Sequence, residues 1–174
     1  MNGLRELIVA KDNPTTFIQS ARTAVAAVVS LLVASLFRLP EPYWAAITTL
    51  IVMQSSLGAA LPVSVQRFAG TAVGATLGAL IGSLQGNAGG FPGKVASFGA
   101  GVFALGMLGA AVRAERGAYR YAGITLAIVM LFPRPENPWI IAVHRFCEVS
   151  IGIAVGLALT ALWPERRSGL KTVE

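Results

Sequence analysis

Residues 139–163 read WIIAVHRFCEVSIGIAVGLALTALW, an apolar run long enough to cross a membrane as a helix. About 20 apolar residues are enough to span the hydrocarbon layer of a bilayer. The rest of the chain has the same character, because 55% of the 174 residues are hydrophobic and only 13% are charged. We therefore predict an all-α integral membrane protein with six transmembrane helices. The other five apolar segments are 17–37, 43–60, 68–85, 95–112 and 119–132.

Short polar joints, marked by proline or glycine, separate these segments and leave no room for a second domain between them. We predict a six-helix transmembrane domain over 17–163, between an N-terminal segment 1–16 and a tail 164–174. Segment 1–16 lacks the pattern of a signal peptide, so we expect the first helix to stay in the membrane. The shortest segment, 119–132, is expected to begin earlier, within 114–121. The joints are Arg38–Pro42, Pro62–Arg67, Gly86–Lys94, Arg113–Ala118 and Pro133–Pro138.

Basic residues are distributed unevenly over the two faces that a six-helix path defines. Most of the fourteen Lys and Arg fall in the termini and near the joints after the second and fourth segments. An excess of basic residues marks the cytoplasmic side, so both termini are predicted to be cytoplasmic in a bacterial inner membrane. The net charge of +6 is explained by a basic surface that faces anionic lipid headgroups. We therefore predict contact with the bilayer and no nucleic-acid partner.

The residues that commonly support catalysis or metal binding are scarce. The single cysteine, Cys147, lies inside the last apolar segment and cannot form an intrachain disulfide. No Cys or His cluster has the spacing of a metal site. Residues 86–93 are glycine-rich but lack the Lys-Ser/Thr ending of a P-loop. We predict no cofactor and no enzymatic activity.

Two patterns recur in the same order, 77 or 78 residues apart. ITTLIVM at 47–53 resembles ITLAIVM at 124–130. The two units would hold three helices each, over about 17–86 and 94–163, so the second would start on the opposite face. This predicts two inverted-topology repeats, as in many transporters. Chance similarity between glycine-rich apolar helices is the alternative. The second pattern is Arg67-Phe68 with Gly74 and Gly78, which resembles Arg145-Phe146 with Gly152 and Gly156.

Glycines recur at every fourth position of the third segment, at Gly70, Gly74, Gly78 and Gly82. Small residues at this spacing form one stripe along a helix and allow close approach of another helix within a membrane. The stripe therefore predicts helix packing. A wall of a narrow pathway and a seam between subunits are the alternatives.

The last segment contains three ionisable residues, His144, Arg145 and Glu148. If Trp139 marks the outer boundary, Glu148 lies about 13 Å inside the membrane. Ionisable groups at that depth are costly and usually form a pair or a proton path. Helical spacing allows Glu148 to pair with either neighbour. We consider two hypotheses, a structural Arg145–Glu148 pair and proton coupling by Glu148 and His144.

Three arginines are predicted to belong to an anion path. Under the repeat, Arg67 at the cytoplasmic mouth and Arg145 near the outer mouth are partners that place positive charge at both ends. Arg22 lies at the membrane edge, where we expect its side chain to snorkel towards the headgroups. Trp44 is expected to act as an interfacial anchor at the outer boundary. Polar residues that could line the path, unless they bond to their own helix, are Thr48, Thr49, Gln54 and Thr125.

The sequence resembles a known family over about residues 15–165. The resemblance rests on Pro42-Tyr43-Trp44, on Arg67-Phe68-Ala69-Gly70-Thr71-Ala72-Val73-Gly74 and on Ala142-Val143-His144-Arg145. In their order and spacing these residues look like the membrane domain of the fusaric acid resistance protein-like and aromatic acid exporter family, which is distantly similar to plant aluminium-activated malate transporters. The resemblance implies efflux of aromatic or other organic carboxylates, driven by the proton gradient, and a homodimer.

Three functions are therefore considered. A proton-coupled exporter of organic, and specifically aromatic, carboxylate anions is the first. A passive anion channel would use the same arginines without titration of Glu148. A membrane subunit that does not transport would use its buried charges only as structural pairs and its glycines only for packing.

Overall fold

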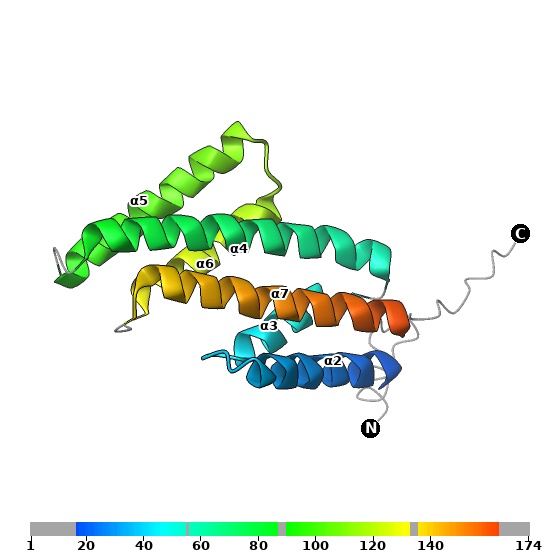
Figure 1. Ribbon diagram of the computed structural model, residues 1–174. Coiled ribbons are helices and arrows are strands. Elements are labelled where there is room, and N and C mark those ends of the chain that lie inside the picture. Colours follow the sequence, from blue (N-terminus) through cyan, green and yellow to red (C-terminus); the bar gives the residue numbers. More distant parts are fainter. Residues whose placement is uncertain (1–16, 55, 87–89, 133–135, 164–174) are drawn as a thin grey trace, which may run out of the picture.

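The computed structural model describes residues 17–54, 56–86, 90–132 and 136–163. Over these residues the chain folds into helices joined by short connections, and no β-strand is present (Figure 1). The all-helical prediction is confirmed. The helices are α2 (Phe17–Leu36), α3 (Tyr43–Val52), α4 (Leu57–Gln85), α5 (Gly90–Ala111), α6 (Arg116–Leu131) and α7 (Pro138–Leu162).

Four of these helices, α2, α4, α5 and α7, are long and apolar enough to cross a membrane. Helix α3 has 10 residues and α6 has 16. At a rise of about 1.5 Å per residue these two reach about 15 and 24 Å, short of a hydrocarbon layer about 30 Å thick. Four of the six predicted spans are therefore confirmed as long enough to cross, whereas α3 and α6 are shorter than the hydrocarbon layer is thick.

The second apolar segment, 43–60, is not one helix. Helix α3 ends at Val52, and Met53 is extended. The side chain of Ser56 then caps a new helix by accepting a hydrogen bond from the Ala59 backbone N–H. The predicted joint 62–67 lies inside that helix. Pro62 costs α4 one backbone hydrogen bond close to its first turn, and the helix continues past it.

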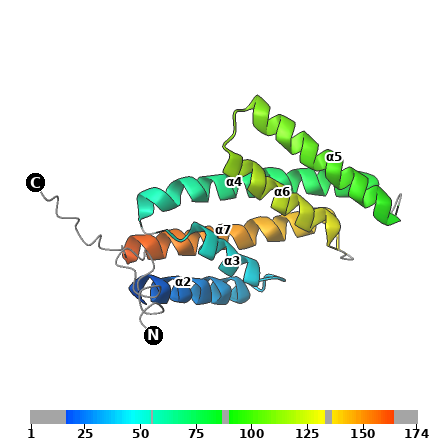
Figure 2. The same cartoon turned by 180° about the vertical axis from the view of Figure 1, so that it is seen from behind.

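Two long helices, α4 and α7, form the centre of the bundle and run in opposite directions (Figures 1 and 2). Helix α6 packs against α4, and α3 packs against α7. Helix α2 covers α3 and α7, whereas α5 lies at the opposite edge, on α6. Helix α5 leans away from α4 towards its C-terminal end, and only Gly101 and Leu105 of its residues are buried. The site residues therefore lie between the two central helices and the two short ones.

The glycine stripe of α4 faces other helices of the same chain. A Cβ atom at Gly74 would overlap the backbone of Ala122 in α6, so these two helices approach at backbone distance. Further along α4, Gly78 faces Val129 of α6 and Gly82 faces Pro138 of α7. The stripe is already occupied within the chain. The alternative that it forms a seam between subunits is therefore wrong.

Large apolar side chains cover the outside of the bundle. Among them are Leu32 on α2, Val65 on α4, Phe103 on α5 and Val143 on α7, each more than half exposed. Exposed apolar side chains on this scale suit a protein whose surface meets lipid. The chain is accordingly an all-helical membrane protein.

Candidate functional site

Three arginine side chains are buried between the helices. Arg22 of α2, Arg67 of α4 and Arg145 of α7 have exposed fractions of 1%, 1% and 2%. Removing a guanidinium from water costs on the order of several kcal/mol unless other groups replace the lost hydrogen bonds. The partners of each arginine therefore indicate its role.

Arg22 holds the ends of two helices together. Its Nη1 donates to the carbonyl oxygen of Trp163 at 2.8 Å, and its Nη2 donates to the carbonyl oxygen of Gln54 at 2.5 Å. Both carbonyls follow the last turn of a helix, α7 and α3, where backbone acceptors have no helical partner. The expectation that Arg22 snorkels is wrong, because its guanidinium binds backbone oxygens inside the bundle.

Arg145 lies between two carboxylates. Its Nη1 is 3.0 Å from Oε2 of Glu148, one turn further along α7, and its Nη2 forms an ion pair with Glu41. Glu41 belongs to the connection between α2 and α3, and its backbone N–H donates to Oε1 of Glu148 at 3.1 Å. The hydroxyl of Tyr43 donates to Oε1 of Glu41 at 2.6 Å. This connection therefore lies against the middle of α7, at the depth of Glu148.

The second neighbour of Arg145 is an aromatic ring. Its guanidinium carbon is 4.6 Å from the centre of the Trp44 ring. A guanidinium over the face of an indole is a favourable cation–π arrangement. Trp44 is half-buried at the start of α3. Its ring therefore packs on a buried charge, a role that the sequence did not predict.

His144 does not form the pair that helical spacing allows with Glu148. Glu148 instead pairs with Arg145. His144 is half-buried, and its Nδ1 is shielded from solvent without a hydrogen-bond partner among the described residues. Of the two pairings considered from the sequence, the structure contains the Arg145–Glu148 pair.

Arg67 differs from Arg145, because no carboxylate in the described part of the chain forms an ion pair with it. It differs from Arg22, because its one hydrogen bond among the described residues is to a side-chain hydroxyl and not to backbone carbonyls. Its Nη2 makes a long contact of 3.4 Å to the hydroxyl of Thr48, and its guanidinium lies 4.9 Å from the centre of the Tyr121 ring. Its Nε and Nη1 are buried without hydrogen-bond partners, as is the hydroxyl of nearby Thr71, one turn along α4. These groups are therefore buried donors without partners among the described residues.

The position of Arg67 also differs from the prediction. Because α4 begins at Leu57, Arg67 lies about 15 Å from the start of the helix. It is therefore inside the bundle and not at a mouth.

The other polar residues of the helices are mostly satisfied locally. The hydroxyl of Thr49 donates to carbonyl oxygens of Ala45 and Gly152, both at 3.0 Å, and the hydroxyl of Thr125 donates to Tyr121 at 3.1 Å. Bonds of this kind leave little capacity for a ligand. Of the four residues proposed to line a path, Thr48 contacts buried Arg67 through its hydroxyl, and Gln54 contacts buried Arg22 through its backbone carbonyl.

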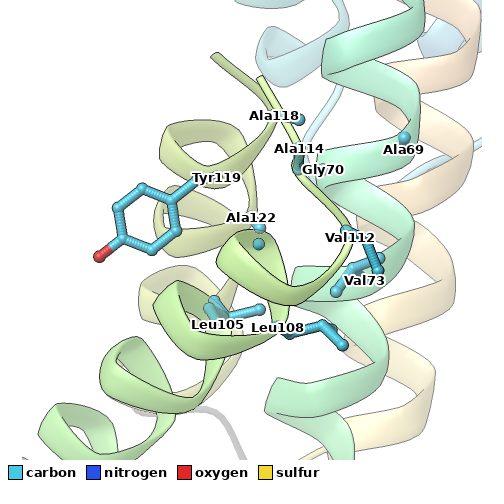
Figure 3. Close-up of a pocket in the computed structure, with 11 residues that line it drawn as sticks. Ala69, Gly70, Val73, Leu105, Leu108, Val112, Ala114, Ala118, Tyr119 and Ala122 are labelled. Atoms are coloured by element: carbon cyan, nitrogen blue, oxygen red, sulfur yellow. The ribbon is translucent and has the colours of Figure 1, made fainter. Parts of the chain in front are cut away.

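Two apolar pockets open between helices. One, of about 170 Å³, lies between α4, α5 and α6, with Tyr119 at its edge (Figure 3). The other, of about 230 Å³, lies between α4 and α7 beside Trp139. Neither is lined by a buried arginine, so they offer space for apolar groups alone. The first is lined by Ala69, Gly70, Val73, Leu105, Leu108, Gly109, Val112, Ala114, Ala118, Tyr119 and Ala122.

Sequence reasoning missed three residues of the site, Glu41, Trp44 in its present role and Tyr121. The backbone N–H of Glu41 donates to Glu148, 107 positions away, and its carboxylate pairs with Arg145, contacts that no local pattern records. A signal was nevertheless present, since Glu41 stands between two prolines directly before an apolar helix. Tyr121 stands 77 positions after Trp44, so the spacing of the proposed repeat relates the two rings.

Buried arginines between helices, four spans and an apolar outer surface define an all-helical membrane protein with charged groups in its interior. The chain belongs to the fusaric acid resistance protein-like family, whose sequence profile matches residues 15–159. The resemblance inferred from the sequence is thus confirmed. The chain is also 29% identical over 151 residues to "Inner membrane protein YeeA" of Escherichia coli (strain K12). That alignment covers 86% of this chain and 41% of the relative, so the chain spans about two fifths of its length.

Proposed function

We propose that this chain is a membrane transporter that exports organic carboxylate anions, with aromatic acids as its main substrates, across a bacterial inner membrane. The family to which it belongs supports a role in efflux. The observation that carries the proposal is Arg67, a buried guanidinium with free donors and no acidic partner among the described residues.

A carboxylate is the ligand that best matches Arg67. Two parallel N–H donors of a guanidinium fit the two oxygens of a carboxylate, and the charge of the ligand compensates the buried cation. The hydroxyl of Thr71 could add a third donor. The Tyr121 ring, already at one face of Arg67, provides an apolar surface on which an aromatic acid could stack.

The proposal includes two inverted repeats, with the site where they meet. Arg67 packs on Tyr121, and Arg145 packs on Trp44. The arginines differ by 78 positions and the rings by 77. Each arginine comes from the third helix of one unit and each ring from the second helix of the other.

The helix crossings support the same relationship. Gly74 meets the backbone of Ala122, and Gly152 meets the backbone of Ala45. These pairs again differ by 78 and 77 positions. The central helices α4 and α7 run in opposite directions, as an inverted repeat requires (Figure 1).

Further elements of the proposal concern energy and assembly. We infer that Glu148 and His144 couple transport to protons, since they are the titratable groups next to Arg145 in α7. We also propose that both termini are cytoplasmic, since an excess of basic residues favours that side of the membrane. A homodimer would use outer faces of the bundle such as that of α5, and crosslinking in intact membranes would detect it.

The test is flux of labelled benzoate in liposomes that contain the purified full chain, with and without a pH gradient at clamped voltage. We expect gradient-driven flux that falls about ten-fold or more in R67Q, the loss of one strong charged contact. The matched control is R120Q, because Arg120 is exposed on α6. Flux that ignores the gradient would indicate a passive channel. Absence of flux for every carboxylate tried, with a partner that co-purifies in fixed ratio, would indicate a membrane subunit that does not transport.

A further inference from the structure

Glu41 differs from the other acidic residue at Arg145 in its access to solvent. The side chain of Glu148 is 1% exposed, whereas that of Glu41 is 19% exposed. Glu41 also belongs to the connection between α2 and α3, outside any helix. Glu41 therefore lies nearer to the surface of the bundle than Glu148 does.

The two carboxylates are held to different degrees. Glu148 is fixed to Arg145 within one turn of α7, and it also accepts the backbone N–H of Glu41. Glu41 reaches Arg145 across the bundle, and the hydroxyl of Tyr43 donates to the same carboxylate. Loss of the Glu41 carboxylate from Arg145 would leave the Arg145–Glu148 pair intact. Glu41 is thus the exchangeable partner.

One guanidinium contacts both carboxylates, so Glu41 and Glu148 share a single arginine. The titratable groups that contact Glu41 include Arg145 and Glu148 of α7 and Tyr43 of α3. Arg22 is the charged residue of α2. It lies near the end of that helix that is farther from Glu41, and it is bonded to the backbone carbonyl of Gln54.

In the half of the bundle that contains Arg67, the positions equivalent to these two carboxylates hold no acidic residue. The positions that correspond to Glu41 and Glu148, at the offsets of 77 and 78 residues, are Ala118 and Gly70. Arg67 accordingly has no acidic partner among the described residues, while Arg145 has two. This asymmetry indicates that carboxylates of the chain itself can occupy the anion-binding position at Arg145.

We propose that Glu41 is a proton-operated plug, an internal carboxylate that occupies Arg145 and competes there with the carboxylate of the transported anion. This inference rests on the proposed function. When Glu41 takes up one proton from solution its negative charge is lost, and Nη2 of Arg145 becomes available to an anion. When the proton leaves, the ionised Glu41 side chain returns to Arg145 and displaces the anion. Acidification of the solution from which Glu41 takes its proton therefore opens the anion path at Arg145.

The flux test compares wild type with E41Q across a pH series. With the same pH on both sides of the membrane, wild-type benzoate flux should rise about ten-fold on acidification, and E41Q should show high flux that no longer depends on this common pH. E136Q is the matched control, because Glu136 is exposed just before α7. E41D, which keeps the carboxylate, should keep the pH dependence. A wild-type pH profile in E41Q would overturn the inference.

A second readout does not depend on transport. The chain has three tryptophans, so W139F/W163F leaves Trp44, 4.6 Å from Arg145, as the only indole. Its fluorescence should change with pH, the change should disappear in E41Q, and benzoate should shift its midpoint to higher pH. A Trp44 response that persists in E41Q, or that benzoate does not shift, would overturn the plug. A Glu41-dependent response without benzoate flux would uphold the plug and overturn the proposed transport.

Discussion

Gly74 of α4 lies so close to Ala122 of α6 that a single methyl group on the glycine would overlap the carbonyl of the alanine. The two helices meet there at backbone distance, and no side chain is available to move aside. Within a membrane, such contacts stabilise helix association through dispersion, because lipid provides no hydrophobic drive between helices.

G74A should therefore destabilise the protein, by about 1–3 kcal/mol, the usual cost of overpacking. Thermal unfolding in detergent would measure the loss. The control is G99A, because a Cβ atom at Gly99 would meet nothing within 4 Å. Equal stability of the two variants would contradict the packing described for α4 and α6.

R22Q should lower stability by about 3 kcal/mol, because the Trp163 and Gln54 carbonyls would lose donors that are charged. Flux per folded molecule should change little, since Nη1 and Nη2 of Arg22 both donate to backbone carbonyls. Thermal unfolding and benzoate flux, with exposed Arg38 replaced in R38Q as the control, would separate the two effects. Reduced flux with unchanged stability would instead assign Arg22 to the anion path.

T71V should act in opposite directions on stability and binding. The Thr71 hydroxyl is buried without a partner, so its replacement by an isosteric methyl group removes a desolvation cost of about 1 kcal/mol. The same change removes a donor beside Arg67 and should weaken benzoate binding. Thermal unfolding with and without benzoate would check both signs. A variant that binds benzoate as tightly as wild type would remove Thr71 from the site.

E148Q should abolish flux driven by a pH gradient while anion exchange at equal pH persists, if Glu148 carries the coupled proton. H144Q should give a smaller effect on stability than E148Q, because His144 lacks the ion pair that Glu148 makes. The measurement is benzoate flux in liposomes at clamped voltage. Undiminished gradient-driven flux in E148Q would end the coupling role of this residue.

Much of this architecture could be predicted from the sequence, because long apolar runs have few alternatives to a membrane helix. The helix boundaries inside the second apolar segment, 43–60, could not be predicted. The backbone becomes extended at Met53 and a new helix begins at Leu57. The sequence signal of that break is the short polar run Gln54-Ser55-Ser56, and a window of about 20 residues averages over it. Pro62 suggested a boundary, yet it stands early enough in α4 for the helix to continue.

Only the contacts of the candidate site between residues close in sequence could be predicted. Arg145 and Glu148 are one helical turn apart, so their pairing follows from local spacing. The pairing of Arg145 with Glu41, and the stacking of Arg67 on Tyr121, depend on how distant helices pack. Such contacts arise from tertiary structure, and sequence periodicity does not contain them.

The contrast between Arg22 and α5 has a consequence for movement. Arg22 ties α2 to the ends of two other helices, whereas the corresponding positions of α5 are Gly99 and Ala100, which cannot make such bonds. Helix α5 is also the least buried of the four spans. A change in its tilt therefore breaks few contacts, while a change in the tilt of α2 breaks two charged hydrogen bonds. Deformation of the bundle should begin at the α5 edge, with the α2 edge serving as the fixed support.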